Sequence, residues 1–147
     1  SLSGTDIKIL WELSRFQWAP ILAEAYVLTK DEKYLNALND YLCDWRLKNP
    51  VNQGIQWKCG QETAIRLLHT LLAAMILDQN PSAPKELKVF ILDHLKRIEP
   101  TTHYAQAQRN NHLTSEAAAL FVGGPWLARL LDEHDPSSAF SPKCYER

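Results

Sequence analysis

Amide, imidazole and guanidinium groups are concentrated just ahead of a short apolar run, Ala117 to Val122. Four of them are consecutive: Arg109, Asn110, Asn111 and His112. One asparagine is explained as a helix N-cap, because its side-chain oxygen accepts a backbone N–H of the first turn. A cap requires neither a second amide nor an imidazole, so this surplus is what a functional interpretation must explain, although capping is the favoured interpretation of the motif taken alone. The free N–H groups and partial positive charge of a helix N-terminus suit a carboxylate or sulfate.

A second polar cluster lies in the sequence WELSRFQ, residues 11–17. Glu12 and Arg15 are spaced i, i+3, and Trp11 and Arg15 are spaced i, i+4, so the three side chains share one face of a helix. An ordinary surface ion pair, which contributes little to stability, is the alternative interpretation.

A third cluster begins at Gln61, where Glu62 and Arg66 are spaced i, i+4. They open the most apolar helix of the chain, and charges on a buried helix need a partner or a solvated cavity. These charges are best explained by a polar cleft, and a surface ion pair between them is the weaker alternative. Aromatic residues near the three clusters could stack against sugar rings, although a place in the core is the favoured interpretation for any one of them. These are Trp11, Trp18, Trp57 and Tyr104.

Composition limits what these clusters can belong to. The 147 residues are 46% hydrophobic and 22% charged, enough for a core in one domain or a piece of one. The net charge of −1 gives no basic face for nucleic acid, and no run approaches the roughly 20 apolar residues of a membrane span. No signal peptide is recognisable, but the chain begins in a predicted helix, as an excised segment would.

Cysteine and histidine spacing does not predict a metal site. Cys43, Cys59 and Cys144 are odd in number and unpaired in spacing, so we expect plain thiols and no disulfide framework or zinc site. The five histidines lack the i, i+4 pairing with an intervening acid that zinc hydrolases use.

Helical periodicity with proline and glycine breaks accounts for nearly the whole chain, and no strand signal is strong. The predicted helices cover residues 7–29, interrupted at Pro20; 31–49, capped by Asp31 and stopped by Asn49-Pro50; 60–78; and 84–100, between two prolines. A loop over 104–110 then leads to a short helix stopped by Gly123-Gly124, Pro125 opens another helix to residue 133, and residues 135–147 form an irregular tail.

The helices differ in how completely they are apolar. The segment 34–45 carries one apolar stripe, as an outer helix does, whereas residues 60–78 are apolar on nearly all sides, as an inner helix is. This alternation predicts an all-α fold of layered antiparallel helical hairpins in a ring or solenoid.

The three clusters together resemble a known family. WELSRFQ (11–17), DWRLKNPVNQGIQWKCGQETAIR (44–66) and RNNHLTSEAAALFVGG (109–124), in this order, resemble the heparinase II/III-like polysaccharide lyases. The resemblance implies that residues 1–147 are a single helical domain, one part of an incomplete α/α toroid that a β-sandwich follows. It also implies an acidic polysaccharide as partner, no cofactor, and a periplasmic or secreted location.

The resemblance further implies a chemistry, β-elimination at a uronic acid. Asn111 and His112 would be the catalytic amide–imidazole pair that neutralises the uronate carboxylate and stabilises the enolate-like charge. The family's tyrosine acid and a further histidine lie downstream of the matching region, and Tyr145 does not fit that motif. The implied substrate-binding or site-shaping residues are Trp11, Glu12, Arg15, Gln61, Glu62, Arg66, Tyr104 and Asn110. A non-catalytic carbohydrate-binding segment and a helical interaction scaffold remain the alternatives.

Overall fold

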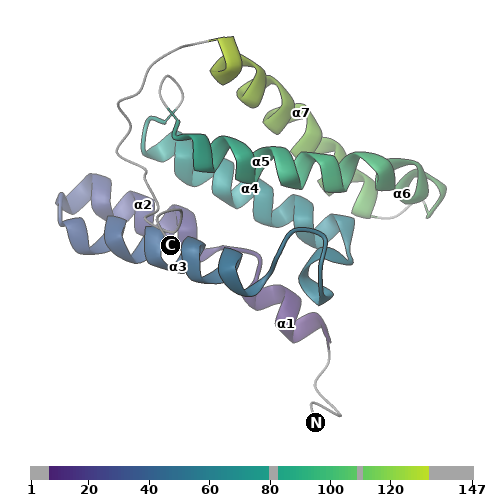
Figure 1. Cartoon of the computed structure of the whole chain (residues 1–147), viewed down its shortest axis with the longest axis horizontal. Helices are drawn as coiled ribbons and strands as arrows, with labels where there is room; N and C mark the ends of the chain where they lie inside the picture. Colours follow the sequence, from purple (N-terminus) through teal and green to yellow (C-terminus); the bar gives the residue numbers. More distant parts are fainter. Residues whose placement is uncertain (1–6, 80–82, 109–110, 133–147) are drawn as a thin grey trace.

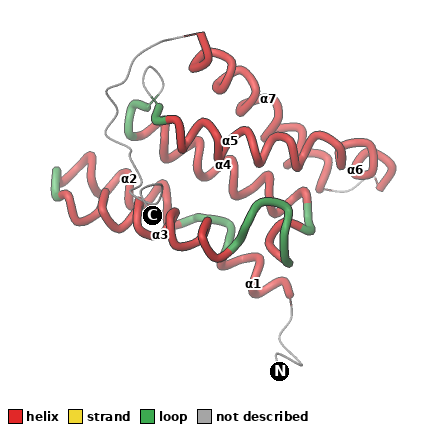
Figure 2. Tube along the Cα trace, viewed as in Figure 1, coloured by secondary structure: helices red, strands yellow, loops and turns green. Residues whose placement is uncertain are grey.

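The computed structural model describes residues 7–79, 83–108 and 111–132, of which 84% are helical and none lies in a strand (Figure 2). The all-α prediction is therefore confirmed. The helices are α1 (Ile7–Leu13), α2 (Trp18–Thr29), α3 (Glu32–Lys48), α4 (Gly60–Ile76), α5 (Lys85–Ile98), α6 (Thr102–Gln108) and α7 (Asn111–Asp132), with 3-10 turns at Ile55–Trp57 and Glu99–Thr101. Within these ranges no helix is long and apolar enough to cross a membrane.

Helix α4 is the centre of the arrangement. It packs against α2, α5 and α7, and more of its residues are buried than in any other described helix. The α2–α3 and α4–α5 pairs are antiparallel hairpins, and α4 and α7 both begin at the right of the view (Figure 1). The prediction that residues 60–78 form the most buried helix is confirmed, with its end at Ile76.

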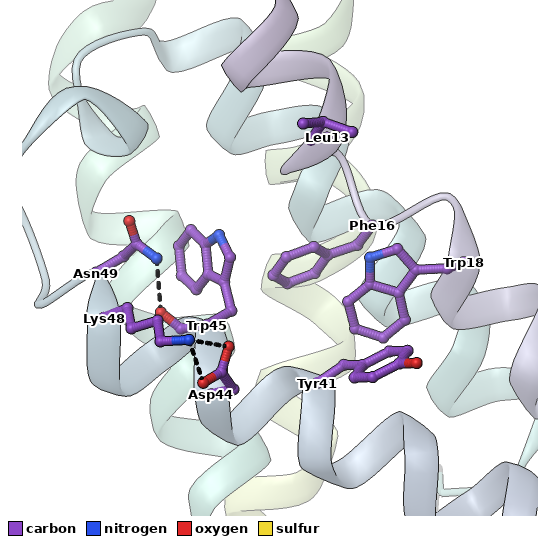
Figure 3. A pocket seen from close by; sticks show the side chains of 8 residues that line it. All are labelled: Leu13, Phe16, Trp18, Tyr41, Asp44, Trp45, Lys48 and Asn49. Carbon is purple, nitrogen blue, oxygen red and sulfur yellow. Dashed lines mark hydrogen bonds and ion pairs between the residues drawn. The ribbon is translucent and has the colours of Figure 1, made fainter. Parts of the chain in front are cut away.

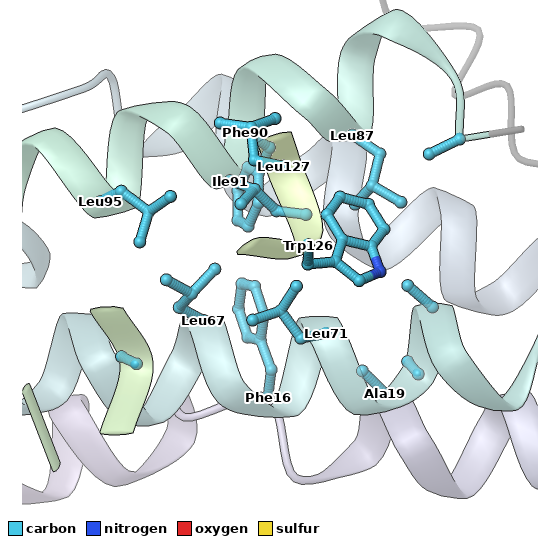
Figure 4. Close-up of a cluster of buried hydrophobic side chains, with 14 of the residues drawn as sticks. Phe16, Ala19, Leu67, Leu71, Leu87, Phe90, Ile91, Leu95, Trp126 and Leu127 are labelled. Carbon is cyan, nitrogen blue, oxygen red and sulfur yellow. The ribbon is translucent and has the colours of Figure 1, made fainter. Parts of the chain in front are cut away.

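The first predicted helix is broken at residues 14–17 and not at Pro20, which is the third residue of α2. A proline is tolerated there because the first-turn N–H groups have no intrahelical acceptor. The break is made by Phe16, whose φ of 62° lies in the left-handed region. This turn directs the Phe16 ring into the core beside Leu71, opposite side chains of α5 and α7 (Figure 4).

The predicted limits of α3 and α5 agree with the structure. Asp31 Oδ1 accepts a hydrogen bond of 3.0 Å from the Lys33 backbone N–H, which confirms it as the N-cap of α3. The helix ends just before Asn49-Pro50, and α5 lies between Pro84 and Pro100. The plain-thiol prediction holds for Cys59 but is wrong for Cys43, which is disulfide-bonded, and Cys144 lies outside the described residues.

Two predictions for the last third of the chain are wrong. Residues 104–108 are helical, in α6, where Ala105 is buried, its described neighbours Tyr104, Gln106 and Ala107 are exposed, and no apolar stripe marks the helix. Helix α7 continues through Gly123, Gly124 and Pro125 without the predicted stop. Gly123 is buried against α4 and α5, so it serves close helix packing and not a left-handed C-cap.

The two glycines of α7 provide a matched test of this packing. A Cβ at Gly123 would lie 3.0 Å from Leu95 Cδ2, whereas a Cβ at Gly124 would have no neighbour within 4 Å. We expect Gly123→Ala to lower the free energy of unfolding by about 1–2 kcal/mol, the cost of overpacking less the helix-propensity gain. Gly124→Ala should change it by less than about 1 kcal/mol. Urea unfolding of both variants measures the difference, and equal effects would contradict the close approach.

Candidate functional site

The second and third polar clusters meet through Arg15 and Glu62. Arg15 Nε donates to Glu62 Oε2 and Nη2 donates to Glu62 Oε1, each over 2.8 Å. This two-bond geometry is the strong, orienting form of an arginine–carboxylate pair. The Arg15 side chain keeps 27% of its surface exposed, whereas Glu62 keeps 6%. Hydrogen bonding to Glu62 raises the pKa of Arg15, so a permanent cation is held at the protein surface.

Arg66 occupies a different place from the one that its spacing predicted. It does not pair with Glu62 but is fully buried, with 0% of its surface exposed. Its Nε donates to His94 Nε2 over 3.0 Å and its Nη2 donates to the Gln56 carbonyl over 3.1 Å. Burial lowers the pKa of Arg66 to about 9, and the charge of Glu62 opposes that effect. The guanidinium therefore stays cationic at neutral pH.

Three aromatic rings surround this cation and form what we call the aromatic cage: Phe16, Trp45 and Trp57. The Arg66 Cζ atom lies 4.4 Å from the Trp45 ring centre, 5.2 Å from that of Trp57 and 5.9 Å from that of Phe16. Cation–π attraction at these distances offsets part of the cost of burying the charge. Trp57, 3% exposed, is therefore a cage wall and not a sugar platform.

His94, which the sequence analysis did not single out, is the hydrogen-bond acceptor for Arg66. It is fully buried, with Nδ1 2.7 Å from the Phe90 carbonyl and Nε2 accepting from Arg66. These partners require the neutral ring with its proton on Nδ1. Burial, and then the charge of Arg66, hold the pKa of His94 well below its usual range. One signal was available, since position 94 falls on the apolar stripe of α5 with Ile91 and Ile98.

The helix that begins within the first cluster, α7, reaches the same end of α4 through Glu116. A Cβ on Gly60 would collide with the Glu116 carboxylate, so the first turn of α4 lies directly against α7. Thr101 Oγ1 lies 3.2 Å from Glu116 Oε2, and Glu116 is only 2% exposed. Asn111 precedes Glu116 by five residues, about 7.5 Å along the helix. The described contacts thus join the second and third clusters directly, and they place Glu116, on the helix that begins within the first cluster, against the same end of α4.

The remaining predicted residues have varied environments. Asn111 is the first residue of α7 and exposed, His112 beside it is half-buried, and Asn110 lies outside the described residues. Trp11 is half-buried, and its Nε1 donates to the Ile55 carbonyl over 2.9 Å. Gln61 is half-buried, and Tyr104, on α6, is 67% exposed. Glu12 is exposed, and its Oε1 lies 3.7 Å from Arg15 Nη1.

A pocket of about 270 Å³ lies between the α1–α2 connection and α3 (Figure 3). Its lining residues are Leu13, Phe16, Trp18, Tyr41, Asp44, Trp45, Lys48 and Asn49. Phe16 and Trp45 line it and also belong to the aromatic cage, so these rings separate the pocket from Arg66. Of the predicted sugar platforms, Trp18 is the one that borders this pocket.

Comparison with known proteins identifies the relatives of this chain. The model of the heparinase II/III N-terminus matches residues 4–134. A heparin-sulfate lyase of Pedobacter heparinus is 28% identical over 125 residues, which is 80% of this chain and 19% of that protein. The chain thus spans about a fifth of that relative's length. No solved structure matches. The family match confirms the resemblance carried by the three clusters: the chain belongs to the heparinase II/III N-terminal family.

Proposed function

We propose that this chain is one part of a longer protein, called below the full-length protein, that cleaves a uronic-acid polysaccharide by β-elimination. Family membership and the name of the heparin-sulfate lyase relative support a polysaccharide lyase acting on an acidic polymer. The observation that carries the proposal is the Arg15–Glu62 ion pair at the N-terminal end of α4, against which Glu116 lies, five residues after Asn111 on α7.

The proposed architecture is part of an incomplete α/α toroid, with residues 1–147 as one unit of it. Helix α4 contacts α2 on one side and α7 on the other, which is consistent with one layer of successive helices. Helices α3 and α5 each pair with a member of that layer and would form the second layer. The proposed irregular tail, residues 135–147, lies outside the described residues.

The proposed chemistry assigns charge stabilisation to the start of α7. The proton α to a uronate carboxylate is too weakly acidic while that carboxylate keeps its full negative charge. Asn111 and His112 would hydrogen-bond the carboxylate, and the helix N-terminus adds its partial positive charge. The base that removes the proton and the acid that protonates the leaving oxygen would come from the remainder of the full-length protein.

Arg15 is the proposed substrate-facing cation. Glu62 occupies two of its five N–H donors, so others remain for a sulfate or carboxylate of the polymer. Glu62 and Arg66 are too deeply buried for direct contact with a polymer, and we assign them to shaping the site. Gln61, Trp11, Glu12, Tyr104 and Asn110 complete the proposed shell around it.

Assays of two proteins on heparan sulfate and alginate test the proposal. The full-length protein is expected to produce an unsaturated uronate, detected by its ultraviolet absorbance, from at least one polymer. The 147-residue chain alone is expected to show no measurable turnover, because general acid–base help worth about 100- to 10,000-fold is missing. Binding by the full-length protein without cleavage would instead favour a carbohydrate-binding segment, and turnover by the 147-residue chain would place the acid within it.

A further inference from the structure

One face of α4 holds the connection that carries Arg15. Glu62, Arg66 and His69 are spaced i, i+4 and i+7, so they lie on one stripe of the helix. Glu62 binds the Arg15 side chain, and His69 Nδ1 lies 2.6 Å from the Arg15 carbonyl. Arg66 Nη1 lies 3.5 Å from the adjoining carbonyl, that of Ser14. Three side chains of α4 therefore fix two consecutive residues.

We propose that Arg66 and His94 are a buried positioning pair for Arg15. His94 fixes the guanidinium of Arg66, and Arg66 in turn fixes the backbone at Ser14, next to Arg15, and at Gln56. The part of this proposal that concerns substrate rests on the proposed function. Neither residue touches substrate, because both have 0% of their surface exposed. Their effect would pass through Ser14 on one side and Gln56 on the other.

The geometry requires an arginine at position 66. Its planar fork sends separate N–H groups to His94, Gln56 and Ser14, which come from three different parts of the chain. Gln56 Nε2 in turn lies 3.4 Å from the Leu10 carbonyl, so the 3-10 turn is tied back to α1. A lysine would keep the charge inside the aromatic cage but cannot present a fixed fork.

The geometry also requires an acceptor at position 94. His94 Nε2 can accept from Arg66 only while the ring is neutral, and protonation would oppose two cations across 3.0 Å. The charged groups that act on His94 are Arg66 from α4 and Arg46 from α3, and both favour the neutral ring. The pKa of His94 in the folded protein lies below its unfolded value of about 6.5. The contribution of the neutral ring to stability is therefore complete above about pH 6.5 and is lost as the pH falls below it.

Variants of the full-length protein test the pair. His94→Leu removes the acceptor, whereas His94→Gln keeps one, because the amide oxygen can replace Nε2. We expect His94→Leu and Arg66→Lys to raise KM on heparan sulfate about tenfold with little change in kcat, as for a lost hydrogen bond to a charged group. His94→Gln should stay near wild type and show a shallower loss of unfolding free energy below pH 6.5.

A chemical measurement reports on Arg15 whether or not the protein is a lyase. An arginine-specific dicarbonyl reagent, with peptide mass spectrometry, gives the modification rate of Arg15 relative to exposed Arg129. We expect this ratio to rise several-fold in His94→Leu and Arg66→Lys and to stay unchanged in His94→Gln. Gly123→Ala, whose added Cβ would have its nearest contacts with Leu95, Leu67 and Leu71 and not with Arg66 or His94, is the control for general loosening.

The outcomes separate the two proposals. An unchanged Arg15 ratio in both His94→Leu and Arg66→Lys would overturn the positioning pair, as would an equal rise in Gly123→Ala. If wild-type protein neither binds nor cleaves any acidic polysaccharide while the ratio changes as expected, the proposed function fails and the positioning of Arg15 by the pair stands.

Discussion

Replacing Arg66 with alanine is expected to lower the free energy of unfolding by about 3–5 kcal/mol, the cost of truncating a large core side chain. The change empties the aromatic cage and leaves His94 Nε2 and the Gln56 carbonyl without their donor. A buried acceptor without a partner costs about 1–3 kcal/mol, which places the expected loss at the upper end of that range. Urea unfolding followed by circular dichroism measures the effect.

Two further variants separate volume from charge. Arg66→Met refills most of the space but donates no hydrogen bond, so a loss of about 1–3 kcal/mol is expected. Lys48→Ala removes a cation of an exposed i, i+4 pair with Asp44 and should cost only about 0.3–0.5 kcal/mol. If Arg66→Ala were as mild as Lys48→Ala, the buried network would not contribute to folding.

Helix limits were predictable where the signal is local. Asp31 caps α3 by a bond to a backbone N–H two residues away, and Pro84 and Pro100 limit α5 through their own ring geometry. Gly123 failed as a stop signal because its role depends on Leu95, which lies on another helix. A glycine chosen for close packing and a glycine chosen for a left-handed turn are identical in sequence.

The candidate site was predictable as a set of clusters but not as a set of partners. The i, i+4 spacing of Glu62 and Arg66 correctly marked unusual charges on a buried helix. It could not show that Glu62 turns outward to Arg15 while Arg66 turns inward to the cage, because both partners are far away in sequence. His94 was missed for the same reason, since its importance comes from the cation that it binds.

Asn111→Ala in the full-length protein is expected to reduce kcat on its polysaccharide about 100- to 1,000-fold, the usual loss for one preorganised donor to a developing oxyanion. Asn111 is exposed at the first position of α7, so its truncation should leave stability nearly unchanged. Asn111→Asp should lose at least as much activity. The aspartate side chain is similar in size to that of asparagine, but it places a negative charge beside the uronate carboxylate. Thr114→Ala, one turn further along the same exposed helix face, is the control and should keep nearly full activity.

The pattern of the kinetic change identifies what Asn111 does. If the amide stabilises charge only as the α-proton leaves, kcat and kcat/KM fall together, because the ground-state complex does not use that stabilisation. If Asn111→Ala raises KM and leaves kcat unchanged, the amide binds substrate and transition state equally, and a role in charge stabilisation is excluded. Steady-state kinetics on a polymer of defined length distinguish the two, with Arg15→Ala as the contrasting variant that is expected to raise KM.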